Sequence, residues 1–123
     1  MNIEAFREYC LSKAGSSESF PFDEDTLVFK VGSAERNKLF ALASLRRQPQ
    51  QVNLKCDPER AINLREQYPS ILPGYHMNKK HWNTIILERE VSATMIKALI
   101  DHSYELVLSS LPKSIQKNIK ISD

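Results

Sequence analysis

The sequence predicts an α+β fold, in which one antiparallel sheet carries helices packed on one face. Three observations predict it. Strand-like segments are grouped together, with helical segments at their flanks rather than between each of them. The connections between the first strands are short and polar, which suits antiparallel hairpins. The chain has 123 residues, 41% of them hydrophobic, which is enough for a single domain over 1–123 with its own core.

The first predicted helix covers residues 2–13, with Asn2 as a suitable N-cap and Gly15 as a suitable stop. Its apolar positions share one helical stripe: Ile3, Phe6 and Cys10. The following stretch, 16–26, is polar and acidic, with two phenylalanines around Pro21. Because proline is confined to the edges of sheets, this stretch predicts a short edge strand at most.

Three strands are predicted next, over residues 26–31, 38–45 and 51–56. The first and the third alternate apolar and polar side chains, which is typical of strands with one buried face. The middle segment is apolar on both faces, which favours a central position in the sheet.

The second predicted helix covers residues 58–67, with Asp57 as N-cap and Pro58 in the first turn. It ends before a proline, because the residue that precedes proline disfavours helical backbone. Residues 69–81 are predicted to be irregular, and a fourth strong strand covers 82–87.

The longest predicted helix begins after Ser92 and ends near residue 111. Its apolar positions form one broad face, which suits packing on the sheet. The tail after about residue 112 is predicted to be a frayed turn.

Charge and composition exclude several classes of protein. The 17 basic and 15 acidic residues give a net charge of +2, far from that of a dedicated nucleic-acid binder. Residues 1–29 carry a net charge of −4 and residues 30–65 carry +5. No apolar run approaches the roughly 18 residues of a membrane span, and the N-terminus lacks an apolar signal segment. Cys10 and Cys56 are predicted to be reduced and buried, which favours the cytoplasm.

Residues 74–84 hold the densest cluster of functional side-chain types. They contain two of the three histidines, the only tryptophan, two asparagines and two lysines. The cluster lies where an irregular loop enters a strand, and loops on a rigid scaffold commonly carry function. Such side chains suit contacts with phosphates and bases. The candidate nucleic-acid-binding residues are Lys79, Lys80, Asn78, His76 and His81, together with Arg46 and Arg47 of a basic hairpin.

A structural interpretation of the same cluster stays open. Asn78 would then fix a turn through its own backbone, and the histidines would bond main-chain carbonyls. We assign a structural role within the motif to Trp82, which would anchor it to the core, and to Thr84.

The stretch from Pro73 to Thr84 resembles the signature of the bacterial MmcQ/YjbR-like proteins, roughly H-x-N-K-x-H-W-x-T. Every fixed position is met, by His76, Asn78, Lys79, His81, Trp82 and Thr84. Residues 52–59 and 101–112 resemble two further segments of that family. The resemblance implies a compact domain similar to the frataxin-like (CyaY-like) fold, described as a double wing. It also implies the label of DNA-binding protein and no enzymatic reaction.

No metal, cofactor or reaction is predicted. The histidines and cysteines lack the close spacing of a structural zinc site. The frataxin-like resemblance suggests a cation on an acidic ridge, although short acidic turns are usually solvated: Glu18, Asp23, Glu24 and Asp25. The sequence contains no nucleophile elbow, Walker A motif or dinucleotide fingerprint.

Two functions follow as hypotheses. The first is a cytoplasmic, non-enzymatic protein that binds DNA weakly and with strong salt dependence, through the 76–84 motif and the basic hairpins. The second is a small-ligand or protein-interaction module, with Tyr75, His76 and His81 walling a pocket between sheet and helices. A DNA binder should gather its lysines and hairpin arginines on one surface. A pocket protein should turn its histidines into a concavity.

Overall fold

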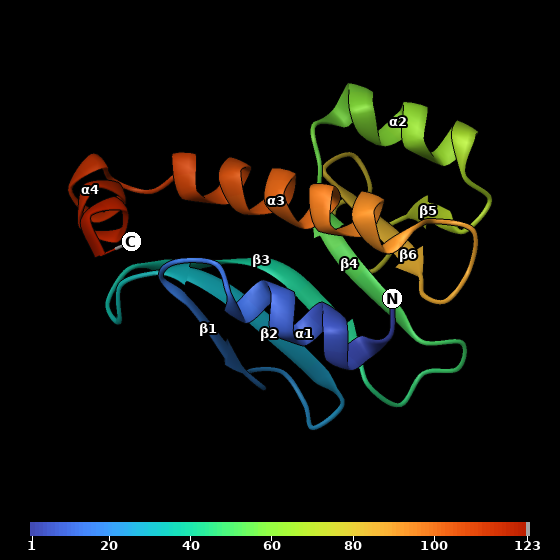
Figure 1. Cartoon of the computed structure of the whole chain (residues 1–123), viewed down its shortest axis with the longest axis horizontal. Coiled ribbons are helices and arrows are strands. Elements are labelled where there is room, and N and C mark those ends of the chain that lie inside the picture. The colour runs from blue at the N-terminus through green and yellow to red at the C-terminus, as the bar shows by residue number, and fades with distance from the viewer. Residues whose placement is uncertain (123) are drawn as a thin grey trace.

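The computed structural model describes residues 1–122 (Figure 1). Within that range there are four helices and six strands, and the first four strands follow one another directly. They are α1 (Ile3–Leu11), β1 (Ser16–Ser19), β2 (Thr26–Gly32), β3 (Asn37–Ser44), β4 (Gln51–Lys55), α2 (Pro58–Gln67), β5 (Ile71–Pro73), β6 (Trp82–Ile86), α3 (Ala93–Ser109) and α4 (Lys113–Ser122).

The strands form one sheet in the order β1-β2-β3-β4-β6-β5, and every neighbouring pair is antiparallel. The predicted α+β class is therefore confirmed. β3 is central, as its apolar character on both faces predicts, and β1 is an edge strand. β3 and β4 pair only over residues 41–44 and 51–54. Beyond this short ladder the two strands diverge, which leaves a fork in the sheet (Figure 1).

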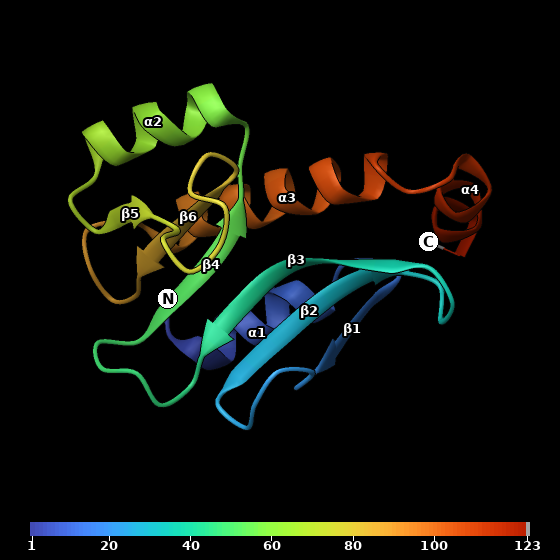
Figure 2. The same cartoon turned by 180° about the vertical axis from the view of Figure 1, so that it is seen from behind.

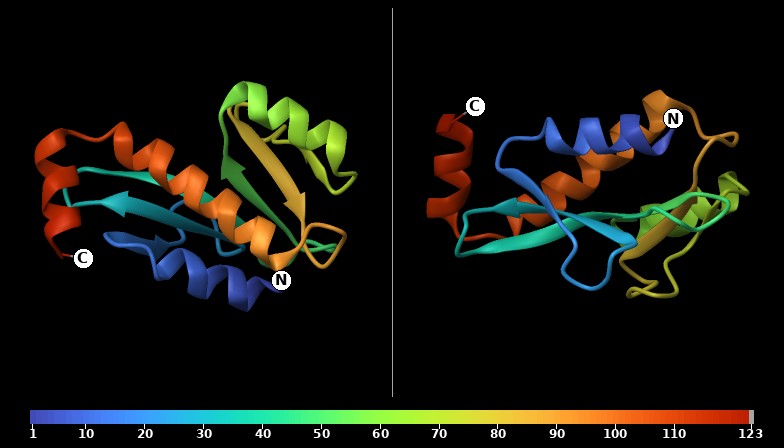
Figure 3. Two further views of the ribbon diagram at one scale, coloured as in Figure 1. Left: turned by 45° about the horizontal axis from the view of Figure 1, so that its top comes forward. Right: turned by 90° about the horizontal axis from the view of Figure 1, so that it is seen from below.

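The main core lies between the sheet and the helices. It joins Phe6 of α1 and Ile100 of α3, both fully buried, to the inward-facing residues of the central strands. Figure 3 shows α1 and α3 on one side of the sheet, while the loops at residues 20–25 and 74–81 extend on the other side. Helices on one face leave the second face of the sheet available to loops and ligands.

Local capping signals place the helix starts where the sequence predicts them. The Asn2 side chain accepts a hydrogen bond from the amide of Ala5 at 2.8 Å. Asp57 caps α2 and Ser92 caps α3 in the same way, at 3.1 Å in each case. Each cap satisfies one of the amide groups that the first helical turn leaves without a partner.

The tail does not form the predicted frayed turn, because residues 113–122 form helix α4. Ile115 and Ile119 lie one turn apart, and both pack against the main core. Gln116 donates a hydrogen bond through Nε2 to the carbonyl oxygen of Leu111 at 2.7 Å, which ties α4 to the end of α3. Packing of this short apolar stripe, rather than helix propensity, stabilises α4.

A second correction concerns residues 71–73, which lie in the segment predicted to be irregular. They form the edge strand β5 by pairing with β6, with Ile71 opposite Ile85. Three residues are too few for a periodic pattern, so the neighbouring strand decides their conformation.

Candidate functional site

The sheet face away from the helices, called the open face below, carries a row of apolar and polar side chains. Val28, Leu42, Asn53, Thr84 and Leu72 stand opposite one another on five adjacent strands. Because side chains alternate along a strand, the residues next to them point into the main core. The open face therefore has its own small apolar cluster, formed by Val28, Leu42 and Trp82 with Leu39 and Met77 packed against it.

Three loops meet on the open face. They are residues 20–25 between β1 and β2, residues 45–50 between β3 and β4, and residues 74–81 between β5 and β6 (Figure 2). The first and second loops leave the same end of the sheet, and the third folds back over β4 and β6. Met77 packs against the cluster of Val28, Leu42 and Trp82, which holds the third loop on this face. The predicted pocket between sheet and helices is thus wrong in position, since the motif loop lies on the opposite side.

The three loops enclose two adjoining hollows, which together we call the open-face groove. The first hollow has a volume of about 470 Å³ and includes Phe22, Leu42, Arg47, Asn53, His76 and Met77 in its lining. The second has a volume of about 250 Å³ and includes Arg47, Pro49, Leu72, Tyr75, His76 and Thr84. Arg47 and His76 border both hollows, so the cation and the imidazole lie where the two hollows meet.

Hydrogen-bond donors point to the chemistry of the groove. The hydroxyl of Thr84 donates to Oδ1 of Asn53 at 2.6 Å, which fixes the Asn53 amide on the sheet. Nδ2 of Asn53 donates to no other group among residues 1–122. The side chains of Arg47 and His76 have no hydrogen-bond or ion-pair partner in this part of the chain either. Three donors with unused capacity therefore face one groove.

The one carboxylate in the first hollow is already engaged by its own loop. Oδ1 of Asp23 accepts hydrogen bonds from the amides of Asp25 and Thr26 at 2.8 and 2.7 Å. These bonds lower the pKa of Asp23, because they stabilise its charged form. Asp23 thereby holds the 20–25 loop, and the other polar groups that line the two hollows are hydroxyls, amides, an imidazole and a guanidinium.

The other predicted motif residues lie outside the groove. Oδ1 of Asn78 accepts the amide of Lys80 at 3.0 Å, as a turn-forming asparagine does. The carbonyl oxygen of Lys79 accepts a hydrogen bond from Arg65 of α2 at 3.3 Å, and both lysine side chains are exposed. The half-buried His81 accepts a hydrogen bond from the amide of Cys56 through its main-chain oxygen at 2.8 Å.

Trp82 and Thr84 form the base of the motif. Trp82 is 8% exposed and belongs to the apolar cluster of the open face, whereas Thr84 binds Asn53. The backbone of Gly74 passes so close that an added Cβ would lie 2.9 Å from Cβ of Trp82. Only glycine allows the loop to close this tightly over the tryptophan.

The basic hairpin residues do not form one patch. Nε of Arg46 lies 3.0 Å from Oδ1 of Asp25, whereas Arg47 borders the groove. Arg36 and Lys38 belong to the β2–β3 hairpin at the far end of β3, where Nζ of Lys38 lies 3.2 Å from Oγ of Ser110. Eight residues of β3 separate the two hairpins, which corresponds to about 26 Å.

Sequence reasoning missed Phe22 and Asn53 as groove residues. A signal for Phe22 existed, since a phenylalanine in an acidic loop beside a proline has little core to join. Asn53 gives no such signal, because a polar residue at an outward position of an alternating strand is ordinary. Its importance depends on Thr84, a partner 31 residues away.

The acidic residues and cysteines form no reactive centre. Glu18 pairs with Arg7 of α1 at 2.6 Å, away from the 20–25 loop. Over residues 1–122, no three histidine, cysteine or acidic side chains gather as metal ligands would. Cys10 and Cys56 are unpaired and buried, as predicted. Burial raises the pKa of both thiols, which disfavours the reactive thiolate.

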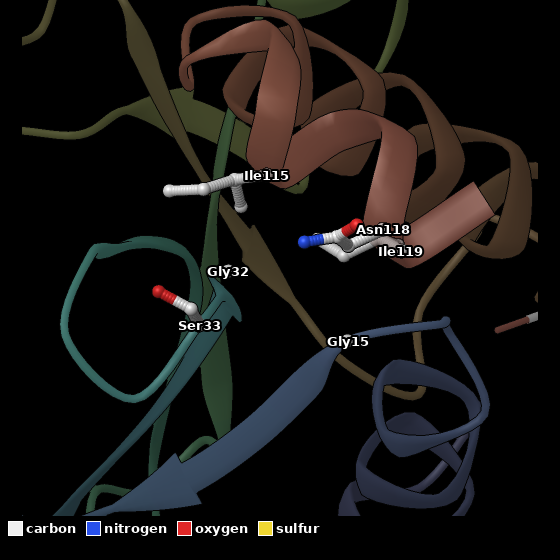
Figure 4. A pocket seen from close by; sticks show the side chains of 6 residues that line it. All are labelled: Gly15, Gly32, Ser33, Ile115, Asn118 and Ile119. Carbon is white, nitrogen blue, oxygen red and sulfur yellow. The ribbon is translucent and has the colours of Figure 1, made fainter. Parts of the chain in front are cut away.

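A third hollow, of about 250 Å³, lies beneath α4 (Figure 4). Ile115, Asn118 and Ile119 lie above Gly15, Gly32 and Ser33 there. Its lining contains no charged group, and the Ser33 hydroxyl already binds the amide of Arg36 at 2.9 Å. This hollow lies where α4 packs over two glycines. The open-face groove is the better candidate site.

A six-stranded antiparallel sheet with helices on one face and a loop-framed groove on the other defines the class of this protein, a small α+β domain. The family model described as YjbR matches residues 11–106, and the chain belongs to the YjbR family. This confirms the resemblance seen at residues 73–84. In the part of the chain that the structure describes, no helix is long and apolar enough to cross a membrane.

Similar proteins come from several bacteria. The chain is 41% identical to the uncharacterized protein YbdF of Escherichia coli O157:H7, over 82% of this chain and 80% of that protein. It is 32% identical to the uncharacterized protein YjbR of Escherichia coli K12, over 95% of this chain and 96% of that protein. A crystal structure of the Deinococcus radiodurans protein DR2400 superposes with a TM-score of 0.90 at 40% identity, over 97% of this chain and 88% of that one. A crystal structure of a Pseudomonas syringae protein superposes with a TM-score of 0.74 at 31% identity, over 87% of this chain and 99% of that one.

Proposed function

We propose that this protein is a non-enzymatic binding domain that holds an organic anion in the open-face groove. One observation carries the proposal: Arg47 and His76, from two different loops, each line both hollows of the groove. A guanidinium group and an imidazole N–H are suitable donors for a carboxylate or phosphate. Both residues stand on loops, and Met77, next to His76, packs against the apolar cluster of the sheet, which restrains that loop and lowers the entropic cost of binding.

The amide of Asn53 supports the same assignment. Its Nδ2 group lines the first hollow with unused donor capacity, while its oxygen is fixed by Thr84. An acceptor on the ligand would satisfy it. We also propose a cytoplasmic location, which the two unpaired cysteines support.

Arg47→Ala tests this function, with Arg46→Ala as a matched control. Both variants remove one exposed arginine, but Arg46 lies beside Asp25 and does not border the groove. Phenyl phosphate serves as the probe, and Trp82 fluorescence reports binding because Trp82 belongs to the same apolar cluster as Leu42, which lines the first hollow. A hydrogen bond to a charged group is worth about 1.5–3 kcal/mol, so Arg47→Ala should weaken binding about tenfold or more.

Arg46→Ala should change the affinity by less than about twofold, because Arg46 does not border the groove and salt screens its attraction for a bound anion. Equal weakening in the two variants would indicate unspecific attraction to net charge. Absence of saturable binding by the unaltered protein would refute the proposed function.

DNA binding stays a second candidate, favoured by the exposure of Lys79 and Lys80, neither of which forms an ion pair among residues 1–122. Duplex DNA lying across this loop would neutralise both lysines and release counterions. Replacing both lysines with alanine should therefore reduce the slope of log affinity against log salt concentration by about two. Arg36→Ala is the control, because Arg36 lies at the far end of β3. Fluorescence anisotropy of labelled duplex gives the slopes, and an unchanged slope would remove the lysines from this function.

A further inference from the structure

Exposed apolar side chains gather around the open-face groove. Five large hydrophobic residues are exposed among residues 1–120, and three of them line the two hollows: Phe22, Leu72 and Tyr75. Phe22 is 65% exposed and Tyr75 is 71% exposed. A fourth, Phe20, lies two residues from Phe22 in the same loop. Apolar side chains clustered around a polar centre are typical of a binding site.

Besides Asp23 and Thr26, which are hydrogen-bonded to each other, the first hollow has three chemically distinct parts. An aromatic ring and a thioether, from Phe22 and Met77, belong to two of the loops. Hydrogen-bonding groups, from Ser44 and Asn53, belong to the sheet. The cation and imidazole of Arg47 and His76 stand at the border with the second hollow. A ligand that uses all three parts has a flat ring, hydroxyl or carbonyl groups and an anion.

Resting on the function proposed above, we infer that the groove takes a nucleotide unit. Its base stacks on Phe22 beside Met77, its sugar hydroxyls bind Asn53 and Ser44, and its phosphate lies between Arg47 and His76. The volume of about 470 Å³ is in the range of pockets for organic ligands of this size. Every base has a flat face, so stacking on an aromatic side chain tolerates any of them.

Simpler anions use the groove less well. An inorganic anion would meet Arg47 and His76 but would leave Phe22 without a partner. An aliphatic carboxylate would meet the same cation and imidazole but would offer Phe22 no flat face for stacking. A base that is stacked and paired within a duplex has no free face for Phe22. The nucleotide unit is therefore either a free mononucleotide or an unpaired residue of a single strand.

Calorimetric titrations with adenosine 5′-monophosphate, adenosine and inorganic phosphate test this inference. The mononucleotide should bind at least tenfold more tightly than phosphate or adenosine alone, because only it engages both the ring and the cation. Phe22→Ala should weaken mononucleotide binding about fivefold or more, and leave phosphate binding unchanged. Phe20→Ala is the matched control and should have less than a twofold effect, because Phe20 lies outside both hollows. Since both rings are exposed, neither variant removes core packing.

The outcomes separate the two proposals. If phosphate and mononucleotide bind equally and Phe22→Ala has no effect, the nucleotide inference is overturned while the anion site stands. If none of the probes binds, including phenyl phosphate, both proposals fail. A single-stranded tetranucleotide that binds more tightly than the mononucleotide supports the single-strand source, and equal affinity supports the free nucleotide. If a short duplex of the same sequence bound as tightly as the single-stranded tetranucleotide, the inferred stacking of an unpaired base on Phe22 would be overturned.

Discussion

Ser103→Ala should lower the free energy of unfolding by about 2–4 kcal/mol, because one hydroxyl closes the fork between β3 and β4. Ser103 is fully buried on α3. Its Oγ donates to the carbonyl oxygen of Phe40 on β3 at 2.6 Å and accepts the amide of Lys55 on β4 at 2.9 Å. The β3–β4 ladder ends at Ala41 and Leu54, so neither group has a ladder partner across the fork.

The magnitude follows from what the substitution leaves behind. Alanine keeps the Cβ but removes the hydroxyl, so one main-chain N–H and one C=O lose their partner. Leaving a buried polar group without a partner costs about 1–3 kcal/mol for each group. Alanine also favours the helix over serine by about half a kcal/mol, which offsets part of the loss. Because a domain is stable by only about 5–15 kcal/mol, the effect is a large fraction of the total.

Urea denaturation followed by circular dichroism measures the change, with Ser109→Ala as the control. Ser109 lies on the same helix but is exposed, so its replacement changes helix propensity alone. The difference between the two variants then isolates the lost hydrogen bonds. Amide exchange at Lys55 should also become faster. A difference below about 0.5 kcal/mol would refute the view that Ser103 closes the fork.

Two further predictions concern the packing of α4 over Gly15 and the pH dependence of the free energy of unfolding. Gly15 has a φ of 72°, and a Cβ there would lie 2.9 Å from Ile119. Gly15→Ala should therefore lower the free energy of unfolding by about 1–3 kcal/mol, and an unchanged melting temperature would contradict this. Nε2 of His102 accepts the amide of Asp57 at 3.1 Å, and burial, assisted by Arg60, lowers the pKa of His102. The folded state thus takes up a proton less readily than the unfolded chain. This contribution to stability is complete above about pH 6.5 and is lost as the pH falls through the lowered folded pKa. Urea midpoints between pH 7.5 and 5 should show a smaller decline for His102→Gln, and parallel curves would exclude His102 as the cause.

Local patterns along the chain predicted most elements of the fold. Asn2, Asp57 and Ser92 cap the helices as predicted, because a cap depends on side chains within four residues. The alternating strand over residues 51–55 was equally clear. Helix α4 was missed because Ile115 and Ile119 form a weak stripe until they meet the core.

The candidate site was predicted only in part. Sequence reasoning drew attention to residues 74–84, and His76 and Tyr75 of that stretch do line the groove. It placed the pocket on the wrong side of the sheet, because no local pattern tells a loop which face to cover. The close approach of Gly74 to Trp82, together with the packing of Met77 against the apolar cluster of the open face, decides that direction.

The sequence by itself determined the α+β class, the family signature and the helix starts, since each depends on residue types a few positions apart. Only the tertiary structure decided that Phe22, Arg47 and His76 share one groove. These residues come from three loops, and the order β1-β2-β3-β4-β6-β5 is what brings those loops onto one face. Strand order and the side that a loop covers depend on long-range packing, which composition and periodicity do not record.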